Sequence, residues 1–207
     1  MNPPGTLPRL VLATKNQGKV EELRLLLEGI GYEIVSLADL PPCPLPPEGD
    51  RSYGENALAK ARAVSKEFRA IALSDDSGLE VDALGGRPGI MSARYGGEGL
   101  TSNEQCLKLL AELEGVPPTR RTARFCAVVA LAAPNGDHAL TEGVLEGVIG
   151  EGLRGEGGFG YDPVFFLPEL GLTLAQVDLA TKNRLSHRAR AVLKARPILE
   201  RWKVAAP

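Results

Sequence analysis

Two adjacent aspartates, Asp75 and Asp76, follow the apolar run AIAL and precede a glycine-rich stretch. Two like charges at the end of a buried strand repel each other and lose hydration unless a positive group lies against them. A divalent metal ion that carries a phosphorylated ligand would supply that charge. Because neighbouring side chains of a strand point to opposite faces, the two carboxylates cannot enter the same core. The alternative is that both aspartates only cap a turn at Ser77–Gly78.

A further carboxylate for such a metal is Glu48, in the proline-rich segment LPPCPLPPEGD. Mg²⁺ is bound by few carboxylates and by the phosphate oxygens of a substrate, so one or two acidic side chains suffice. Proline removes a backbone donor and fixes φ, which predicts a shaped loop for this segment instead of a helix or a central strand.

A phosphate-binding segment is predicted at TKNQGK, residues 14–19, where a strand ends and a helix begins. Free backbone N–H groups, a hydroxyl and two lysines favour a bound anion there. An ordinary helix N-terminus with exposed lysines explains the same residues. The segment is not a P-loop, because Ala13 and Val20 stand where that motif needs glycine and Ser or Thr.

The helix predicted after Ser52 places Asn56 and Lys60 one turn apart on a single face. The pair could point into a cleft, although a solvated face is the simpler expectation from the sequence alone. Ser52 and Glu55 have the spacing of a capping box, which predicts where this helix begins.

The stretch GGFGYDP surrounds Phe159 and Tyr161 with small residues, so the backbone can approach a planar ligand and a ring can stack on it. A glycine-rich turn with two buried rings is the alternative. GEGLRG at 150–155 matches a dinucleotide fingerprint by letter, but the residues after it cannot open the required helix. Lys182, His187 and Arg188 add cations near the start of the last helix.

The chain has 207 residues, 43% hydrophobic and 24% charged, with a net charge of -2. This balance is typical of a globular protein, and the lack of a basic excess disfavours nucleic-acid binding. Three cysteines without a CxxC pair predict reduced thiols and no zinc site. Neither a signal peptide nor an apolar run of about 20 residues is evident, so we expect a cytoplasmic protein without a membrane span.

Predicted helices and strands alternate in the first half of the chain, and a hairpin follows. We therefore predict an α/β fold with a mixed central sheet flanked by helices, in which two lobes of one domain, residues 1–207, enclose a nucleotide-binding cleft. The predicted strands are 9–14, 32–37, 70–76, 122–133, 137–150 and 163–166, and the predicted helices are 20–29, 55–68, 103–115 and 185–202.

Several segments together resemble the inosine triphosphate pyrophosphatase, or Ham1, family. They are LATKNQGKVEEL, ENALAKAR, DDSGLEVDALGGRPGIMSARYGGEG, GGFGYDPVFF and SHRARA, in the order of the family and over nearly the whole chain. The resemblance implies a homodimer that needs Mg²⁺. It also implies hydrolysis of ITP, dITP, XTP and dXTP to the monophosphate and pyrophosphate, by attack of water on the α-phosphorus, which removes these nucleotides from the pool.

The resemblance also implies roles for individual residues. Asp76 is expected to accept a proton and to hold the metal with Glu48, while Asp75 supports it. The triphosphate contacts are expected at Thr14, Lys15, Asn16, Gln17, Gly18, Lys19 and Lys60, with Ser77 at the substrate. The nucleoside is expected at Phe159, Gly160, Tyr161, Asp162, Lys182, His187 and Arg188.

Selectivity for the base is expected to come from His187 and Arg188, whose donors would pair with the carbonyl at C6 of hypoxanthine or xanthine. Adenine carries an amino group there and would leave both donors unpaired. Two other functions fit the same residues: a pyrophosphatase for nucleotides in general, and a nucleotide sensor that binds without hydrolysis. The acidic residues Asp75, Asp76 and Glu48 argue against a sensor, which has no need to activate water.

Overall fold

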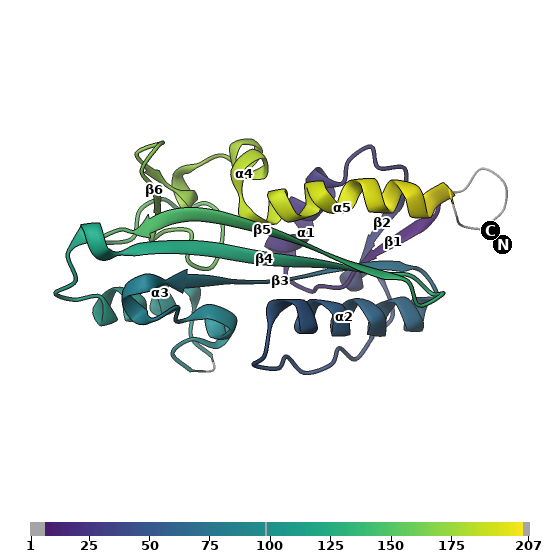
Figure 1. Ribbon diagram of the computed structural model, residues 1–207, viewed down its shortest axis with the longest axis horizontal. Helices are drawn as coiled ribbons and strands as arrows, with labels where there is room; N and C mark the ends of the chain where they lie inside the picture. Colours follow the sequence, from purple (N-terminus) through teal and green to yellow (C-terminus); the bar gives the residue numbers. More distant parts are fainter. Residues whose placement is uncertain (1–6, 98, 205–207) are drawn as a thin grey trace. The chain divides into compact units, whose positions relative to one another are not determined.

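The computed structural model describes residues 7–97 and 99–204 (Figure 1). Residues 1–6, on which much of the expectation about a signal peptide rests, lie outside the described part. Seven strands form one mixed sheet in the order β2-β1-β3-β4-β5-β6-β7, so the α/β prediction is confirmed. Within residues 7–97 and 99–204, no helix has both the length and the apolar character that crossing a membrane requires.

The elements have the following bounds. The strands are β1 (Arg9–Leu12), β2 (Glu33–Ser36), β3 (Ile71–Val81), β4 (Thr122–Ala132), β5 (His138–Ile149), β6 (Phe165–Leu167) and β7 (Leu172–Thr173). The helices are α1 (Gln17–Leu26), α2 (Tyr53–Phe68), α3 (Ser102–Glu112), α4 (Leu179–Leu185) and α5 (His187–Val204).

The chain divides into two compact units. Unit 1 is Met1–Asp76, Ala127–Gly143 and Arg188–Pro207, and unit 2 is Ser77–Cys126 and Val144–His187. A division into two parts agrees with the two lobes expected from the sequence, whereas the cleft between lobes stays a prediction.

Unit 1 buries both faces of its part of the sheet, because successive side chains of β1 and β3 alternate between two cores. Leu12 and Leu73 lie in the core that includes α1 and α5. Val11 and Ala72 lie in the core that includes Val64 of α2. Figure 1 shows α2 on one face of these strands and α5 on the other. An odd-numbered side chain of β3 in this unit therefore faces α1 and α5, and an even-numbered one faces α2.

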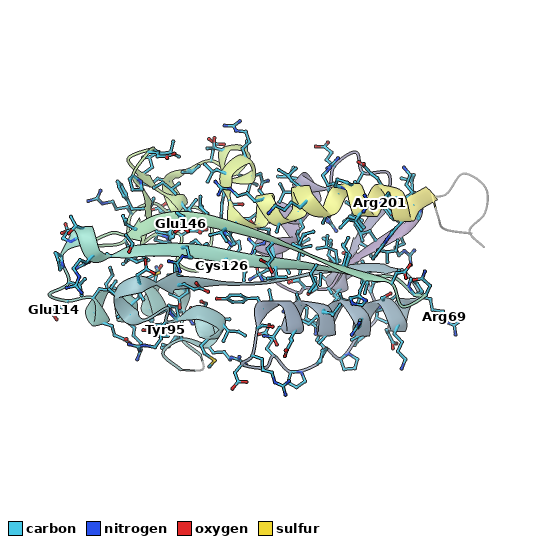
Figure 2. All side chains as sticks on the ribbon, in the orientation of Figure 1. Arg69, Tyr95, Glu114, Cys126, Glu146 and Arg201 are labelled. Atoms are coloured by element: carbon cyan, nitrogen blue, oxygen red, sulfur yellow. The ribbon has the colours of Figure 1, made fainter. Side chains whose placement is uncertain are left out.

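Unit 2 buries one face of its strands. Leu79, Phe125 and Leu145 pack there with side chains of α3. On the other face Arg124 pairs with Glu80, Asp82 and Glu146, at distances of 3.3, 2.7 and 3.6 Å. Figure 2 labels Cys126 and Glu146, which lie on β4 and β5.

Two local predictions are confirmed, one alternative is ruled out, and one helix was missed. The Ser52 side chain accepts a hydrogen bond from Glu55 N at 3.1 Å and begins α2, and the predicted hairpin is β4 and β5. The turn considered at Ser77–Gly78 is absent from this described segment, because β3 continues to Val81. Helix α4 was not expected; Asp178 caps it by accepting from Thr181 N at 2.8 Å.

Candidate functional site

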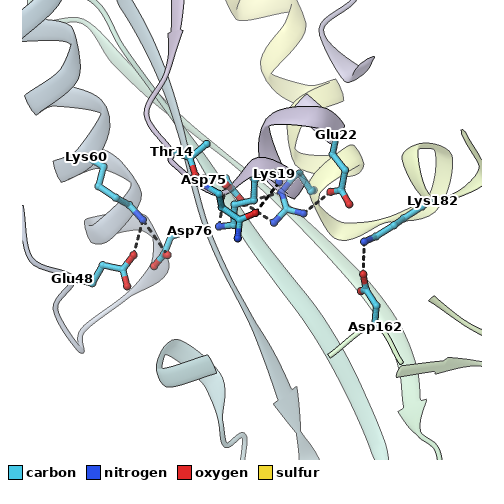
Figure 3. A network of polar contacts seen from close by, with 11 residues as sticks. Thr14, Lys19, Glu22, Glu48, Lys60, Asp75, Asp76, Asp162 and Lys182 are labelled. Carbon is cyan, nitrogen blue, oxygen red and sulfur yellow. Dashed lines mark hydrogen bonds and ion pairs between the residues drawn. The ribbon is translucent and has the colours of Figure 1, made fainter. Parts of the chain in front are cut away.

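Asp75 is the centre of a buried, charge-balanced cluster in unit 1. Its Oδ2 accepts a hydrogen bond from Arg188 Nε at 2.9 Å, and its Oδ1 lies 3.1 Å from Lys19 Nζ. Arg188 also donates from Nη1 to Glu22 Oε2 at 2.6 Å. Two acids from β3 and α1 thus meet two cations from α1 and α5 (Figure 3). The side chain of Arg188 is only 1% exposed, and its pairs with Asp75 and Glu22 compensate for the loss of hydration of the buried charge.

The electrostatics of this cluster keep Asp75 ionised. Burial by itself raises the pKa of the Asp75 carboxyl, but the charges of Arg188 and Lys19 outweigh burial and hold that pKa well below its usual range. For Arg188, burial alone lowers the pKa, and Asp75 with Glu22 reverses the effect. Burial lowers the pKa of the Lys19 ammonium, which Asp75 only partly offsets. Asp75 is therefore an anchor for cations and not a group that exchanges protons near neutral pH.

Asp76 lies on the other face of β3, against α2. Its Oδ2 accepts from Asn56 Nδ2 at 3.1 Å, and its Oδ1 accepts from Lys60 Nζ at 3.3 Å. Lys60 also donates to Glu48 Oε1 at 2.9 Å, so one ammonium joins two carboxylates (Figure 3). Asn56 bonds both polar backbone atoms of Gly49, at 2.8 and 3.1 Å. This amide ties the proline-rich segment to the strand and so places Glu48 near Asp76.

The pKa of Asp76 shifts in the opposite direction to that of its neighbour. Burial raises the pKa of the Asp76 carboxyl, and the nearby Glu48 raises it further, although Lys60 and Asn56 oppose the shift. For Lys60, burial lowers the pKa, but Asp76 and Glu48 together bring it above its ordinary value. A carboxylate whose proton affinity has been increased is suited to accept a proton from water.

Glu48 and Asp76 also form a donor set that fits a hard divalent cation. Their oxygens already converge on one positive charge, the Lys60 ammonium. Among residues 7–97 and 99–204, no group of three or more His, Cys, Asp or Glu side chains gathers in a way that could hold a metal. Two carboxylates agree with Mg²⁺ sites in which substrate phosphate oxygens complete the coordination.

The segment 14–19 has the geometry of a capped helix N-terminus. Asn16 is the N-cap of α1 and accepts from Lys19 N at 3.1 Å. Thr14 Oγ1 accepts from Asn16 N at 3.2 Å. Lys15 and Gln17 are exposed, whereas Gly18 and Lys19 are half-buried. The segment joins β1 to α1, and Lys19 links it to Asp75.

Unit 2 holds a second cluster, built around Asp162. The Asp162 Oδ2 accepts from Lys182 Nζ at 2.5 Å and from Phe159 N at 2.8 Å. The Lys182 ammonium lies 4.7 Å from the centre of the Phe159 ring, within the range of a cation–π contact. A Cβ at Gly158, where φ is +71°, would collide with the Asp162 carboxylate. The glycine is therefore required by both its backbone angle and its neighbour.

The loop that carries this cluster is fixed by close backbone contacts, which explains its glycines. Gly157 N donates to Ala175 O at 3.0 Å, and a Cβ at Gly155 would lie 2.5 Å from the Ala175 backbone. Tyr161 donates its hydroxyl to Ser92 O at 2.9 Å, and burial raises the pKa of that hydroxyl. The Cys106 thiol contacts Gly160 O at 3.5 Å. Gly155, Gly157 and Gly158 are thus explained by close packing, with no need for a bound dinucleotide.

The remaining predicted residues are placed as follows. His187 is buried at the first position of α5, in unit 2, and Arg188 next to it belongs to unit 1. Ser77 is half-buried in β3, directly after Asp76. Gly160 and Tyr161 lie in the loop of the second cluster. The structure thus joins Lys19, Asp75 and Arg188 in one group, Glu48, Lys60 and Asp76 in another, and Phe159, Asp162 and Lys182 in a third.

One residue of these groups was not expected from the sequence, and two others are buried where a solvated face was the simpler expectation. Glu22 is 2% exposed and holds Arg188, although the apolar pattern of α1 gave it no role. Asn56 and Lys60 are 6% and 8% exposed, so the solvated face that seemed simpler is wrong. Their one-turn spacing on an alanine-rich helix was the available signal for a joint role.

Comparisons with known proteins point to one family. A model of the Ham1 family matches residues 10–198 of this chain. A dITP/XTP pyrophosphatase of Desulforamulus reducens is 50% identical over 193 residues, which are 93% of this chain and 96% of that protein. A dITP/XTP pyrophosphatase of Geobacillus kaustophilus is 48% identical over 197 residues, 95% of each chain. The solved structure of a HAM1 protein from Coxiella burnetii is similar with a TM-score of 0.84 and 36% identity, covering 94% of this chain and 100% of that one.

Proposed function

Because the chain belongs to the Ham1 family, we propose that it hydrolyses deaminated purine nucleoside triphosphates to the monophosphate and pyrophosphate. The substrate class is dITP, ITP, XTP and dXTP, and the relatives named dITP/XTP pyrophosphatase support it. The observation that carries the proposal is the arrangement around β3. Asp75 is paired with buried cations, and the adjacent Asp76 is a carboxylate of raised pKa beside Lys60 and Glu48.

The reaction uses the two carboxylates of β3 differently. Asp76 accepts a proton from the water that attacks the α-phosphorus, and its raised pKa supports this role. Lys60, Lys19 and Lys15 offset the charge of the leaving pyrophosphate, with Thr14, Asn16, Gln17 and Gly18 presenting hydroxyl, amide and backbone donors. Asp75 keeps Lys19 and Arg188 in place, and we assign Ser77 to the substrate because it follows Asp76 directly.

We assign Mg²⁺ as the cofactor, held by Glu48 and Asp76. When bound, a divalent cation neutralises phosphate charge and lowers the pKa of a water molecule that it coordinates. The chain's own contribution is the pair of carboxylates whose oxygens converge on Lys60.

The nucleoside is assigned to the cluster of unit 2 and to the start of α5. Phe159, Gly160 and Tyr161 offer a ring and an open backbone, while Asp162 orients Lys182. His187 donates to the carbonyl at C6 of the base. Arg188 belongs to the same set as an oriented donor, because Asp75 and Glu22 fix the plane of its guanidinium.

The remaining assignments follow from the proposed role. We propose that residues 1–207 act as one pyrophosphatase domain, that the protein is a cytoplasmic homodimer, and that it binds neither nucleic acid nor membranes. A net charge of -2 supports the absence of a nucleic-acid role.

The test is turnover of dITP, XTP, dGTP and dATP with Mg²⁺, with pyrophosphate and orthophosphate measured separately. We expect pyrophosphate from dITP and XTP, and a loss of about 10²- to 10⁴-fold in Asp76→Asn. Equal rates on all four nucleotides would favour the general pyrophosphatase, and orthophosphate as the product would contradict the reaction. Binding of dITP without turnover would support the sensor.

A further inference from the structure

The imidazole of His187 is stacked on the ring of Phe125. The two ring centres are 4.7 Å apart and the planes differ by 11°. Both side chains are buried, with exposed fractions of 4% for His187 and 7% for Phe125. A nearly parallel stack of this kind defines the plane in which the imidazole lies. The two ring nitrogens of a histidine lie in its ring plane, so the stack also sets the directions in which they form hydrogen bonds.

Phe125 is itself held in place by its surroundings. It belongs to β4, and its side chain points into the core of unit 2. Phe165 of β6 packs against it, with ring centres 4.6 Å apart and planes inclined by 45°. Phe165 is fully buried. An aromatic ring that is fixed by a strand and by a second ring is a rigid support for a third.

We propose that Phe125 is a positioning residue for base selection, because it fixes the plane of the His187 imidazole. The proposal rests on the proposed function, in which His187 donates to the carbonyl at C6. Loss of the stack removes one contact that holds the imidazole in this plane, so its donor is less narrowly directed. Preorganised donors discriminate between a carbonyl and an amino group better than mobile ones. Phe125 thus acts on selectivity through His187 without a substrate contact of its own.

Two substitutions and a matched control separate positioning from packing. Phe125→Leu and Phe125→Met both remove the ring, and the methionine is a flexible side chain that can adapt to the space left behind. Phe165→Leu is the matched control. It also replaces a buried phenylalanine by leucine in the same aromatic cluster, but the ring it removes packs on Phe125 and is not the ring stacked on His187. For each variant, kcat and KM are measured for dITP and dATP with Mg²⁺.

We expect KM for dITP to rise about three- to tenfold in both Phe125 variants, with kcat changed less, and the preference for dITP over dATP to narrow by a similar factor. Phe165→Leu affects the imidazole only indirectly, through Phe125, so it should narrow this preference clearly less than either Phe125 variant does. An unchanged preference in folded Phe125 variants would overturn the proposal. Equal narrowing in Phe165→Leu would overturn it as well, because a general packing effect would then explain both.

Proton NMR of the imidazoles tests the geometry without any substrate. The chain has two histidines, so exposed His138 is an internal reference for His187. Stacking on Phe125 should shift the ring protons of His187 upfield of those of His138, and the shift should vanish in Phe125→Met. Absence of an upfield shift in the unmodified protein would contradict the proposal even if no Phe125 variant folds. Failure of the parent to turn over dITP would instead contradict the proposed function.

Discussion

Asp75 and Asp76 share one peptide bond, yet their carboxylates take opposite faces of β3. The first faces Lys19 and Arg188, and the second faces Asn56 and Lys60. Their pKa values shift in opposite directions for that reason, downward for Asp75 and upward for Asp76. This difference supports the proposal that two chemically identical side chains have two tasks, structural support for Asp75 and proton transfer for Asp76.

The two aspartates should respond differently to the same substitution. Asp75→Asn leaves Lys19 and Arg188 buried with too little negative charge, and the free energy of unfolding should fall by about 3–5 kcal/mol. Asp76→Asn neutralises a carboxylate that burial already disfavours in its charged form, so the cost should stay near 1 kcal/mol while turnover is lost. Urea denaturation of both variants measures the difference. Equal destabilisation would contradict the assignment of separate tasks.

Glu22 should prove to be a structural part of the site. Glu22→Gln replaces a buried charged acceptor of Arg188 by a neutral one, and we expect the free energy of unfolding to fall by about 1.5–3 kcal/mol. Glu21→Gln is the matched control, because the neighbouring side chain is exposed on the same helix. Thermal denaturation of the two variants gives the comparison. A destabilisation as large in the control would mean that loss of helix charge, and not the pair with Arg188, is responsible.

Gly158 should be needed for the second cluster. Gly158→Ala adds a methyl group that collides with the Asp162 carboxylate at a backbone angle that disfavours alanine. We expect Asp162 to move, Lys182 to lose its partner and KM for dITP to rise at least about fivefold. Gly152→Ala is the control in the same loop, since a Cβ there meets no atom within 4 Å and φ is not positive. Similar kinetics for the two variants would argue against this cluster as the nucleoside site.

The cysteine thiols should react slowly in the folded protein. Burial raises the pKa of Cys106 to about 12 and that of Cys126 to about 11, and it also raises the pKa of Cys43. A thiol reacts as the thiolate, so at pH 8 only roughly one Cys126 in a thousand is reactive at any moment.

Alkylation with iodoacetamide, followed by mass spectrometry, checks this expectation. While the pH stays below the pKa of a thiol, its labelling rate should rise about tenfold for each unit of added pH. Cys126 should react before Cys106, because it is half-buried and its pKa is the lower of the two. All three thiols should react quickly in urea. Rapid labelling of Cys106 in the native protein would show that α3 is less tightly packed than the structure indicates.

Much of the fold follows from local patterns in the sequence. Thr101 and Glu104 form a capping box that begins α3, and the alternation of β3 predicted that the two aspartates would separate. Such features depend on residues a few positions apart, whose side chains meet whatever the rest of the chain does.

The missed features depend on partners far apart in sequence. Glu22 and Arg188 are 166 positions apart, and no pattern within α1 shows that a guanidinium will meet this carboxylate. The amide of Asn56 joins two segments, at Gly49 and Asp76, that lie on either side of it in the chain. The burial of a polar side chain can be predicted only when its contact with a partner can be predicted. Neither the contact between Glu22 and Arg188 nor the contacts of Asn56 with Gly49 and Asp76 follow from the sequence pattern.

The strand that separates the aspartates also limits which genetic changes this chain tolerates. β3 pairs with β1 in a fixed register, with Leu12 opposite Leu73. One codon gained or lost between Ile71 and Asp75 would exchange the two faces and bring each aspartate to the partners of the other. Insertions and deletions compatible with activity are therefore expected at exposed turns such as Pro134–Gly136, and not within this strand, even where substitutions in it survive.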